Sequence, residues 1–210
     1  MSNEFIKRVL SSIILIPIAL FFIIKGSFLF NFFIILCLVI SLYEWHMMSN
    51  KKSYNIFGHL FLIFSFYSAY FVRNEFTAGF FIFLVIILIC ICTDIGGYVF
   101  GKILGGPKLT KISPQKTYTG VFGGFLLSII FVYIFYDYLD ENFNLKEFIL
   151  IILISTISQI GDIVVSYFKR LSKIKDTGKL IPGHGGILDR IDGMIFAFPS
   201  YFSIYLIISL

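Results

Sequence analysis

Charged residues are scarce in this sequence: Asp, Glu, Lys and Arg supply only 14% of the 210 residues, whereas 58% are hydrophobic. Soluble domains usually contain about 25% charged residues, and the mean hydropathy here is +0.93. This composition excludes an ordinary soluble protein and indicates a chain that crosses a membrane several times. The length suits one helical bundle and leaves no room for a separate soluble domain.

Cysteine is also rare, and the three cysteines, Cys37, Cys90 and Cys92, all lie inside apolar runs. No pair has a Cys-x-x-Cys spacing, and no His stands at a zinc-site spacing from them. We therefore expect small packing residues, with no disulfide framework and no zinc. A cleavage pattern of small residues is missing after the apolar segment 9–24, which predicts an uncleaved first span.

Long apolar runs predict an all-α fold, a polytopic transmembrane helical bundle of about seven spans with about 20 apolar residues each. The expected spans cover residues 9–24, 28–44, 55–72, 76–100, 119–137, 148–168 and 191–210. Fourteen of the 17 glycines lie at or beyond Gly96. The first three spans are therefore expected to be plain lipid-facing helices, and the later ones to carry the function.

The distribution of positive charge predicts the orientation. With the N-terminus in the cytoplasm and seven alternating spans, 14 of the 17 Lys and Arg residues fall on the cytoplasmic side. Only Lys25, Arg73 and Lys146 fall outside, where the segment 137–147 is acidic. This split follows the positive-inside rule. It predicts a multi-pass protein of the cell (inner or plasma) membrane whose basic loops face the cytoplasm.

Glycines recur every fourth position in two later segments. Gly97, Gly101 and Gly105 form one such series, and Gly120 and Gly124 form another. This spacing is typical of helices that pack closely in membranes. We expect such packing here in preference to direct phosphate contact, and a homodimer interface is an alternative to packing within one chain.

A polar stretch, residues 166–192, interrupts the apolar sequence and combines basic, acidic and glycine residues. Phosphate chemistry needs this mixture, because cations neutralise phosphates, carboxylates hold a divalent metal and glycines let backbone N–H groups approach. His184, flanked by glycines, is placed to donate a hydrogen bond to a phosphate. The alternative is a solvated loop whose positive charges only set the topology.

Asp162 lies in the sixth expected span, on one helical face with Ser155, Ser158, Gln159 and Ser166. A carboxylate at a helix centre in a membrane costs roughly 2.5–3.5 kcal/mol, so Asp162 needs a partner or a metal. Two further carboxylates, Asp94 and Asp189, are expected at the same cytoplasmic side. Convergence of the three would suit Mg²⁺, which prefers oxygen ligands. A structural Asp162 paired with a loop Lys or Arg is the alternative.

The expected loop 105–117 alternates lysines, hydroxyl residues and turn residues. Its Lys108, Lys111 and Lys116 suit either a nucleoside triphosphate or anionic lipid headgroups. Topology-setting lysines are the simpler interpretation of each single residue.

The polar stretch also carries a long motif. It runs Ser166-x-Phe-Lys169-Arg170-x4-Lys175-Asp176-x-Gly178-x2-Ile-Pro-x-His184-Gly185-Gly186-Ile-x-Asp189-Arg190-Ile-Asp192. This pattern resembles the signature of the phosphatidate cytidylyltransferases (CDP-diacylglycerol synthases). The segments 93–102 and 111–120 also resemble that family, so the likeness covers about residues 90–210. The sequence departs from the family at Thr119, where members commonly have Glu, and has a short N-terminal region.

The resemblance implies transfer of a cytidylyl group from CTP to phosphatidate in the lipid bilayer, with Mg²⁺ held by Asp162 and Asp189 and no nucleic-acid partner. The residues implied in catalysis are Asp162, Asp189, Lys169, Arg170, Lys175, Asp176, His184, Arg190 and Asp192. Those implied in substrate binding are Asp94, Ser113, Lys116, Thr117, Ser166, Gly185 and Gly186. It divides the chain into N-terminal transmembrane helices, 1–75, and catalytic transmembrane helices with two basic cytoplasmic loops, 76–210.

Other functions fit parts of the same pattern. A CTP-dependent polyprenol kinase would share the basic nucleotide loop but not the full motif. Prenyl-transferring and CDP-alcohol-transferring enzymes usually carry D-x-x-x-D or D-G-x-x-A-R runs, which are missing here. A cation transporter or channel would line its path with Asp94, Asp162 and Asp189, but would distribute carboxylates across the depth of the bilayer. A small adaptor protein would leave the Gly/His/Asp loop unexplained.

Overall fold

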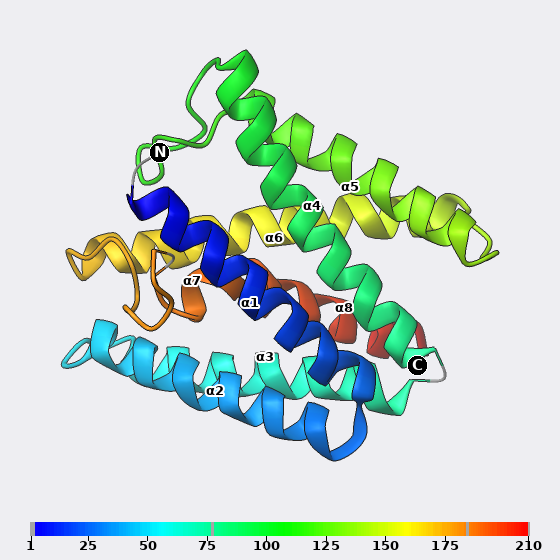
Figure 1. Ribbon diagram of the computed structural model, residues 1–210, viewed down its shortest axis with the longest axis horizontal. Helices are drawn as coiled ribbons and strands as arrows, with labels where there is room; N and C mark the ends of the chain where they lie inside the picture. Colours follow the sequence, from blue (N-terminus) through cyan, green and yellow to red (C-terminus); the bar gives the residue numbers. More distant parts are fainter. Residues whose placement is uncertain (1–2, 77, 184, 210) are drawn as a thin grey trace. The chain divides into compact units, whose positions relative to one another are not determined.

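The computed structural model describes residues 3–76, 78–183 and 185–209, with side chains from residue 11 to residue 207 apart from 12, 77 and 184. Within these ranges the chain is helical, with two isolated β-bridges and no strand. The helices are α1 (Asn3–Lys25), α2 (Ser27–Ser49), α3 (Asn55–Glu75), α4 (Gly79–Leu104), α5 (Tyr118–Tyr138), α6 (Leu145–Leu171), α7 (Leu188–Ile191) and α8 (Met194–Ser209) (Figure 1).

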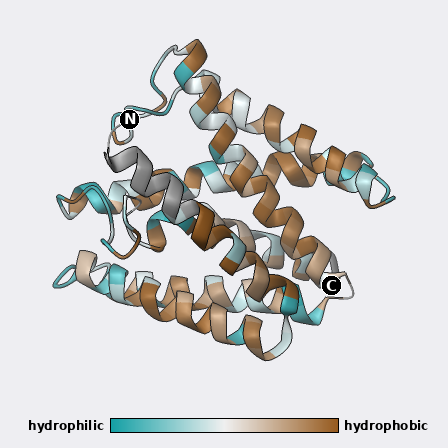
Figure 2. Ribbon diagram, viewed as in Figure 1, coloured by the Kyte–Doolittle hydropathy of each residue, from teal (hydrophilic) through white to brown (hydrophobic). Residues whose placement is uncertain are grey.

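Each predicted span corresponds to one of these helices, and the all-α prediction is confirmed. Over the described residues, α2, α3, α4, α5 and α6 are long and apolar enough to cross a membrane. The apolar parts of α1 and α8, Ile13–Lys25 and Met194–Ile207, are shorter. Figure 2 shows hydrophobic residues along the helices and hydrophilic residues mainly in the connecting loops. The chain is a multi-pass membrane protein with five candidate spans, and the count of seven stays a prediction.

The chain forms two compact units. The first unit consists of Met1–Tyr70 and Phe168–Ile191, and the second of Phe71–Tyr167 and Asp192–Leu210. The functional division at residues 75 and 76 that the sequence predicts stays a prediction. Because α7 is separate from α8, Asp189 and Asp192 do not share one continuous helix.

In the second unit, α4 and α5 pack closely along their glycines (Figure 1). A Cβ on Gly96 would overlap the Gly123 carbonyl oxygen, and one on Gly120 would lie 2.7 Å from the Gly97 oxygen. The prediction of close helix packing is therefore confirmed for these helices. Gly105 is an exception: it has φ +61°, follows the last residue of α4, and a Cβ on it would meet nothing within 4 Å. Gly105 therefore ends the helix, and it does not take part in the close glycine packing of α4 and α5.

The loop 105–117 connects α4 to α5 and folds back on itself. Lys108 and Thr117 form an isolated β-bridge, and the Leu109 N–H donates to the Lys116 oxygen at 2.7 Å. The Thr117 hydroxyl then accepts a hydrogen bond from the Gly120 N–H at 3.1 Å and caps α5. The hydroxyl of Thr119 donates to the Gly105 oxygen. Lys116 is thus held next to the first turn of α5.

In the first unit, α2 packs against α1 and α7. Trp45, near the C-terminal end of α2, connects this helix to α3, because its indole N–H donates to the Asn55 oxygen at 3.0 Å. A Cβ on Gly58 would overlap the Trp45 ring, so α3 begins directly against this side chain. Phe168 lies edge-on to Trp45, with ring centroids 5.2 Å apart. These aromatic contacts bring the end of α2 next to the segment that begins the polar stretch.

Candidate active site

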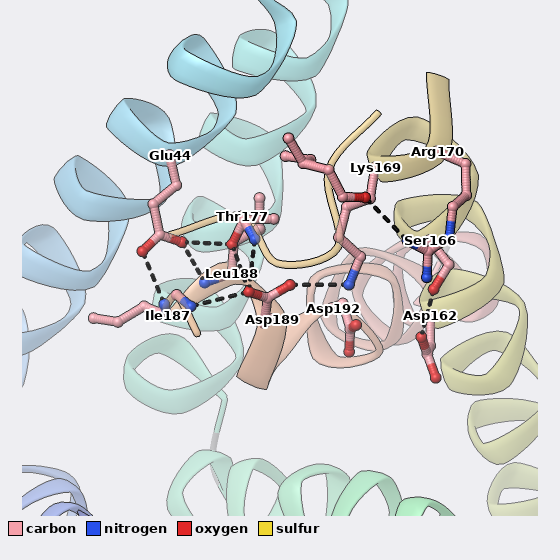
Figure 3. A network of polar contacts seen from close by, with 12 residues as sticks. Glu44, Asp162, Ser166, Lys169, Arg170, Thr177, Ile187, Leu188, Asp189 and Asp192 are labelled. Carbon is pink, nitrogen blue, oxygen red and sulfur yellow. Dashed lines mark hydrogen bonds and ion pairs between the residues drawn. The ribbon is translucent and has the colours of Figure 1, made fainter. Parts of the chain in front are cut away.

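The polar stretch in the first unit is built around the carboxylate of Asp189 (Figure 3). We call residues 172–187, between α6 and α7, the signature loop. Asp189 Oδ1 accepts a hydrogen bond from Lys169 Nζ at 2.9 Å. Its Oδ2 accepts from the Thr177 N–H at 2.8 Å and the Gly186 N–H at 2.9 Å, and lies 3.0 Å from the Thr177 hydroxyl. One side chain thus holds the beginning and the end of the loop.

The Asp189–Lys169 pair is shielded from solvent, since the two side chains are only 4% and 10% exposed. Burial raises the pKa of the Asp189 carboxyl, but the N–H of Gly186, the hydrogen bond and charge of Lys169 and the N–H of Thr177 outweigh it and hold that pKa below its ordinary value. Hydrogen bonds to the charged form have this effect on a carboxylate. Asp189 is therefore an anion that fixes the position of a cation.

A second carboxylate, that of Glu44 in the C-terminal part of α2, also holds the signature loop (Figure 3). It is 4% exposed. Its oxygens accept hydrogen bonds from the Thr177 hydroxyl at 3.0 Å, the Ile187 N–H at 3.0 Å and the Leu188 N–H at 2.9 Å. The expectation that the first three spans are plain lipid-facing helices is therefore wrong for α2.

Glycines of the signature loop lie directly on these two carboxylates. A Cβ on Gly178 would be 2.8 Å from Glu44 Oε1, and one on Gly186 would overlap Glu44 Oε2. Gly185 has φ +89°, and its Cβ would be 2.6 Å from Asp189 Oδ2. Side chains are excluded because the backbone must approach acidic groups of the same chain. The implied role of Gly185 and Gly186 in substrate binding stays a prediction.

A pocket of about 410 Å³ opens beside the start of the signature loop. Its lining combines apolar side chains of α2 with polar loop residues: Met47, Met48, Ile174, Lys175, Asp176, Thr177, Gly178 and Lys179. Lys175 and Asp176 are exposed. Arg170, also exposed, donates from its guanidinium to the Ile174 oxygen at 3.0 Å and so steadies the chain where it leaves α6. Two of the predicted catalytic residues thus border a cavity.

In the second unit, Asp162 of α6 forms an ion pair with Lys116 of the loop 105–117. The Ser166 hydroxyl donates to Asp162 Oδ1 at 3.3 Å, and Lys116 Nζ donates to the Gln159 oxygen at 3.4 Å. The side chains of Lys116 and Asp162 are 25% and 26% exposed. The expected need of Asp162 for a partner is met by Lys116, and three predicted site residues lie together here.

The remaining predicted residues have other surroundings. Asp94 is exposed on α4, and Ser113 is half-buried in the loop, where its oxygen accepts from the Lys116 N–H at 3.0 Å. Arg190 is exposed, whereas Asp192 is buried and accepts from the Gly193 N–H at 3.0 Å. His184 lies outside the described residues. Asp162 and Asp189 belong to different units, so their convergence stays a prediction.

The described residues contain no group of three or more His, Cys, Asp or Glu side chains that could hold a metal ion. The two predicted ligands nevertheless have spare coordination capacity. Among the described residues, Asp189 Oδ2 has three donor groups within hydrogen-bond distance, whereas Oδ1 accepts from Lys169 alone. Each Asp162 oxygen has one partner. A carboxylate oxygen has two lone pairs, so Oδ1 of Asp189 and the Asp162 carboxylate fit an oxygen-preferring cation.

Sequence reasoning missed Glu44 and also Thr177, whose hydroxyl lies between the carboxylates of Glu44 and Asp189. A signal for Glu44 was present, because it is the one acidic residue within the apolar segment 27–49. An ionisable residue in a membrane-spanning segment usually has a function and a partner. Thr177 has no such signal, because it occupies a position that the motif leaves unspecified.

Comparison with known proteins agrees with the motif. The sequence model of the Cytidylyltransferase family matches residues 6–76 and 56–208, which together cover nearly the whole chain. A Phosphatidate cytidylyltransferase of Staphylococcus epidermidis is 45% identical over 114 residues, which make up 53% of this chain and 44% of that protein. The relative of the same name from Staphylococcus aureus has the same identity and coverage.

A Phosphatidate cytidylyltransferase of Staphylococcus haemolyticus is 44% identical over 109 residues, 51% of this chain and 42% of that protein. The chain thus spans less than half the length of these relatives. The match of the family pattern extends from α1 to α8 and includes both the signature loop and the helix that carries Glu44. The chain therefore belongs to the cytidylyltransferase family.

Proposed function

We propose that this protein transfers the cytidylyl group of CTP to phosphatidate, giving CDP-diacylglycerol and pyrophosphate for phospholipid biosynthesis. The observation that carries the proposal is the 45% identity over 114 residues to proteins named Phosphatidate cytidylyltransferase. The chemistry of the site supports it. Buried and half-buried cations beside carboxylates, in a chain with several candidate membrane spans, suit a reaction between a polyphosphate and a lipid phosphate.

In the proposed reaction, an oxygen of the phosphatidate phosphate forms a bond to the α-phosphorus of CTP. The bond from that phosphorus to the bridging oxygen breaks, and pyrophosphate leaves with the electron pair. The attacking oxygen is already anionic, so the protein needs no nucleophile of its own. Its task is to position the phosphates and to stabilise charge, as in other phosphoryl transfers.

Five basic residues would supply that stabilisation: Lys116, Lys169, Arg170, Lys175 and Arg190. Lys169 is held in place by Asp189, and Lys116 by Asp162. Asp162 and Oδ1 of Asp189 would hold Mg²⁺, which would neutralise the negative charge that develops on the phosphates. We propose further that seven helices span the membrane, with the N-terminus and both basic loops in the cytoplasm, where CTP is available.

Dimerisation is also a proposal. The glycine series that suggested it is partly used within the chain: a Cβ on Gly97 would be 3.8 Å from the Gly120 oxygen, and one on Gly101 would be 3.0 Å from the Thr117 hydroxyl. A homodimer would therefore have to use surfaces other than the face of α4 that packs against α5.

The test uses purified protein in vesicles that contain phosphatidate, with CTP labelled at the α-phosphate. We expect labelled CDP-diacylglycerol and release of pyrophosphate with Mg²⁺, and loss of both with a chelator. Asp162→Asn should abolish turnover, whereas Asp140→Asn, an exposed acidic residue between α5 and α6, should leave it unchanged. Full turnover in Asp162→Asn would remove the metal assignment. Phosphate transfer to a polyprenol instead would favour the kinase.

A further inference from the structure

The carboxylate of Glu44 is the only acidic group of α2. The hydrogen bonds that it accepts come from the signature loop and the start of α7. Oε2 accepts from the Thr177 hydroxyl and the Leu188 N–H, and Oε1 from the Ile187 N–H. These partners flank residues 178–186. Glu44 thus fastens the two ends of this segment to a helix that lies 133 positions before Thr177 in the chain.

Nothing else among the described contacts could replace this carboxylate. Leu188 is fully buried, so its N–H would have no partner without Glu44. The first N–H groups of a helix lack partners within the helix, and a buried donor left unpaired is costly. Gly178 and Gly186 lie against the carboxylate so closely that a Cβ on either would collide with it or nearly so. The close contact of these glycines with the Glu44 carboxylate leaves no space for a longer or bulkier acceptor at position 44.

Thr177 connects Glu44 to the cation of the site. Its hydroxyl lies 3.0 Å from Glu44 Oε2 and 3.0 Å from Asp189 Oδ2, and it can donate its one proton to either. Its backbone N–H donates to the same Asp189 oxygen at 2.8 Å. Asp189 in turn holds Lys169 at 2.9 Å. Figure 3 shows this continuous chain of contacts from Glu44 to Lys169.

We propose that Glu44 is a positioning residue for the transfer reaction. It holds Thr177 and the N–H groups of Ile187 and Leu188, and through them it keeps Asp189 and Lys169 oriented for the substrate phosphates. Because Glu44 is buried, we expect it to affect the reaction by positioning the signature loop and not by direct contact with a substrate. The inference rests on the proposed function for its kinetic part and on the loop contacts alone for its structural part.

The test compares Glu44→Gln with Ser41→Ala in the 210-residue protein in phosphatidate vesicles. Gln keeps the shape of Glu but turns an NH₂ group toward groups that are themselves donors. We expect kcat/KM for CTP to fall at least tenfold, with KM raised at least threefold, because a loosened loop presents its cations poorly. A smaller folded fraction would lower the apparent kcat and leave KM unchanged.

Ser41→Ala is the matched control, because Ser41 is buried on α2 one turn before Glu44 and its hydroxyl has no hydrogen-bond partner among the described residues. It should leave KM and kcat within twofold. A second readout does not depend on activity. Trypsin should cleave after Lys175 or Lys179 at least threefold faster in Glu44→Gln than in the wild type, and at the wild-type rate in Ser41→Ala.

If Glu44→Gln does not fold, Thr177→Val provides a second test of the inference. Val keeps the shape of Thr and the backbone N–H but removes the hydroxyl that connects the two carboxylates, so KM for CTP should rise. Thr177→Ser keeps a hydroxyl and should have the KM of the wild type. Folded variants with an unchanged KM and unchanged cleavage would overturn the inference. A wild-type protein without transferase activity would refute the proposed function instead, while the cleavage rates would still show whether Glu44 holds the loop.

Discussion

Two ion pairs of similar chemistry differ in their exposure to solvent. The side chains of Lys169 and Asp189 are 10% and 4% exposed, whereas those of Lys116 and Asp162 are 25% and 26% exposed. Removing one partner of a buried pair typically costs about 3–5 kcal/mol, because the other charge stays buried. A partly exposed pair contributes about 0–1 kcal/mol. The Lys169–Asp189 pair is therefore expected to stabilise the fold. The Lys116–Asp162 pair contributes less to stability and is accessible for binding substrate phosphates.

Lys116→Met tests this difference. We expect the free energy of unfolding to change by about 1 kcal/mol or less, while transferase activity falls at least tenfold because a cation for the phosphates is lost. Thermal unfolding in detergent and the vesicle assay measure the two effects. Lys111→Met, an exposed lysine of the same loop, is the control and should change both far less. Equal activity in both variants would argue against a substrate role for Lys116.

The lowered pKa of Asp189 predicts how stability depends on pH. The folded state holds the proton less tightly than the unfolded state, whose pKa is near the ordinary 3.8. The ionised carboxylate therefore stabilises the fold fully above that value, and this contribution is lost as the pH falls through the lower folded-state pKa. The loss belongs to the region below about pH 4.

Asp189→Asn should remove this dependence. At pH 7, without divalent metal, we expect the variant to unfold at a lower temperature than the wild type. As the pH is lowered from 5 to 3, the difference should shrink, because the wild type loses the contribution that the variant never had. Thermal unfolding at a series of pH values measures it. A difference that stays constant down to pH 3 would contradict the assigned pKa direction.

Among the helices, the contact of α4 with α5 depends on backbone atoms that meet directly. Gly96 lies against the Gly123 carbonyl, and neither group can move without shifting a helix. Gly97, the next residue, has its nearest α5 atom 3.8 Å from a Cβ position, which is an ordinary contact. Neighbouring glycines on one helix therefore differ in whether they tolerate a methyl group.

Gly96→Ala and Gly97→Ala form a matched pair. Gly96→Ala should destabilise the protein by about 1–3 kcal/mol, the usual cost of overpacking. Gly97→Ala should be neutral or slightly stabilising, because Ala favours the helix over Gly by up to about 1 kcal/mol. Unfolding in detergent checks both values. Similar losses in the two variants would show that the helices approach differently.

The helices could be predicted from the sequence because a membrane-spanning helix needs a long apolar run, and such runs are visible without tertiary information. The pairing of Lys169 with Asp189 could not be predicted. Both residues were expected to act on ligands, and nothing in local spacing shows that they bind each other. Glu44 was missed because its partners lie far away in the chain. The Lys116 partner of Asp162 was anticipated only as one of several basic loop residues.

On the scale of the whole molecule, chain order constrains the side of the membrane on which each loop lies. The loops 105–117 and 172–187 are separated by α5 and α6, both candidate spans. If both helices cross the membrane, the chain returns to the side from which it started, so we expect the two basic loops on the same side whether or not α1 and α8 cross. The positive-inside rule predicts that this face is cytoplasmic.

Thiol labelling of intact cells tests this orientation. In a variant without Cys37, Cys90 and Cys92, we expect Asn142→Cys, between α5 and α6, to react with a membrane-impermeant maleimide added outside. Leu180→Cys, in the signature loop, should react only after the membrane is opened. Both native residues are exposed, so access is limited by the membrane alone. The reverse pattern would place the proposed active site on the wrong side for cytoplasmic CTP.

The separation of Glu44 from Thr177, 133 positions along the chain, has a consequence for biosynthesis. A ribosome adds roughly 5–20 residues per second, so α2 emerges on the order of ten seconds before the residues that satisfy its carboxylate exist. During that interval the Glu44 carboxylate lacks the hydrogen-bond donors that it has in the folded protein. Because a buried charge without partners is costly, we expect water to solvate this carboxylate until residues 177–188 have been synthesised.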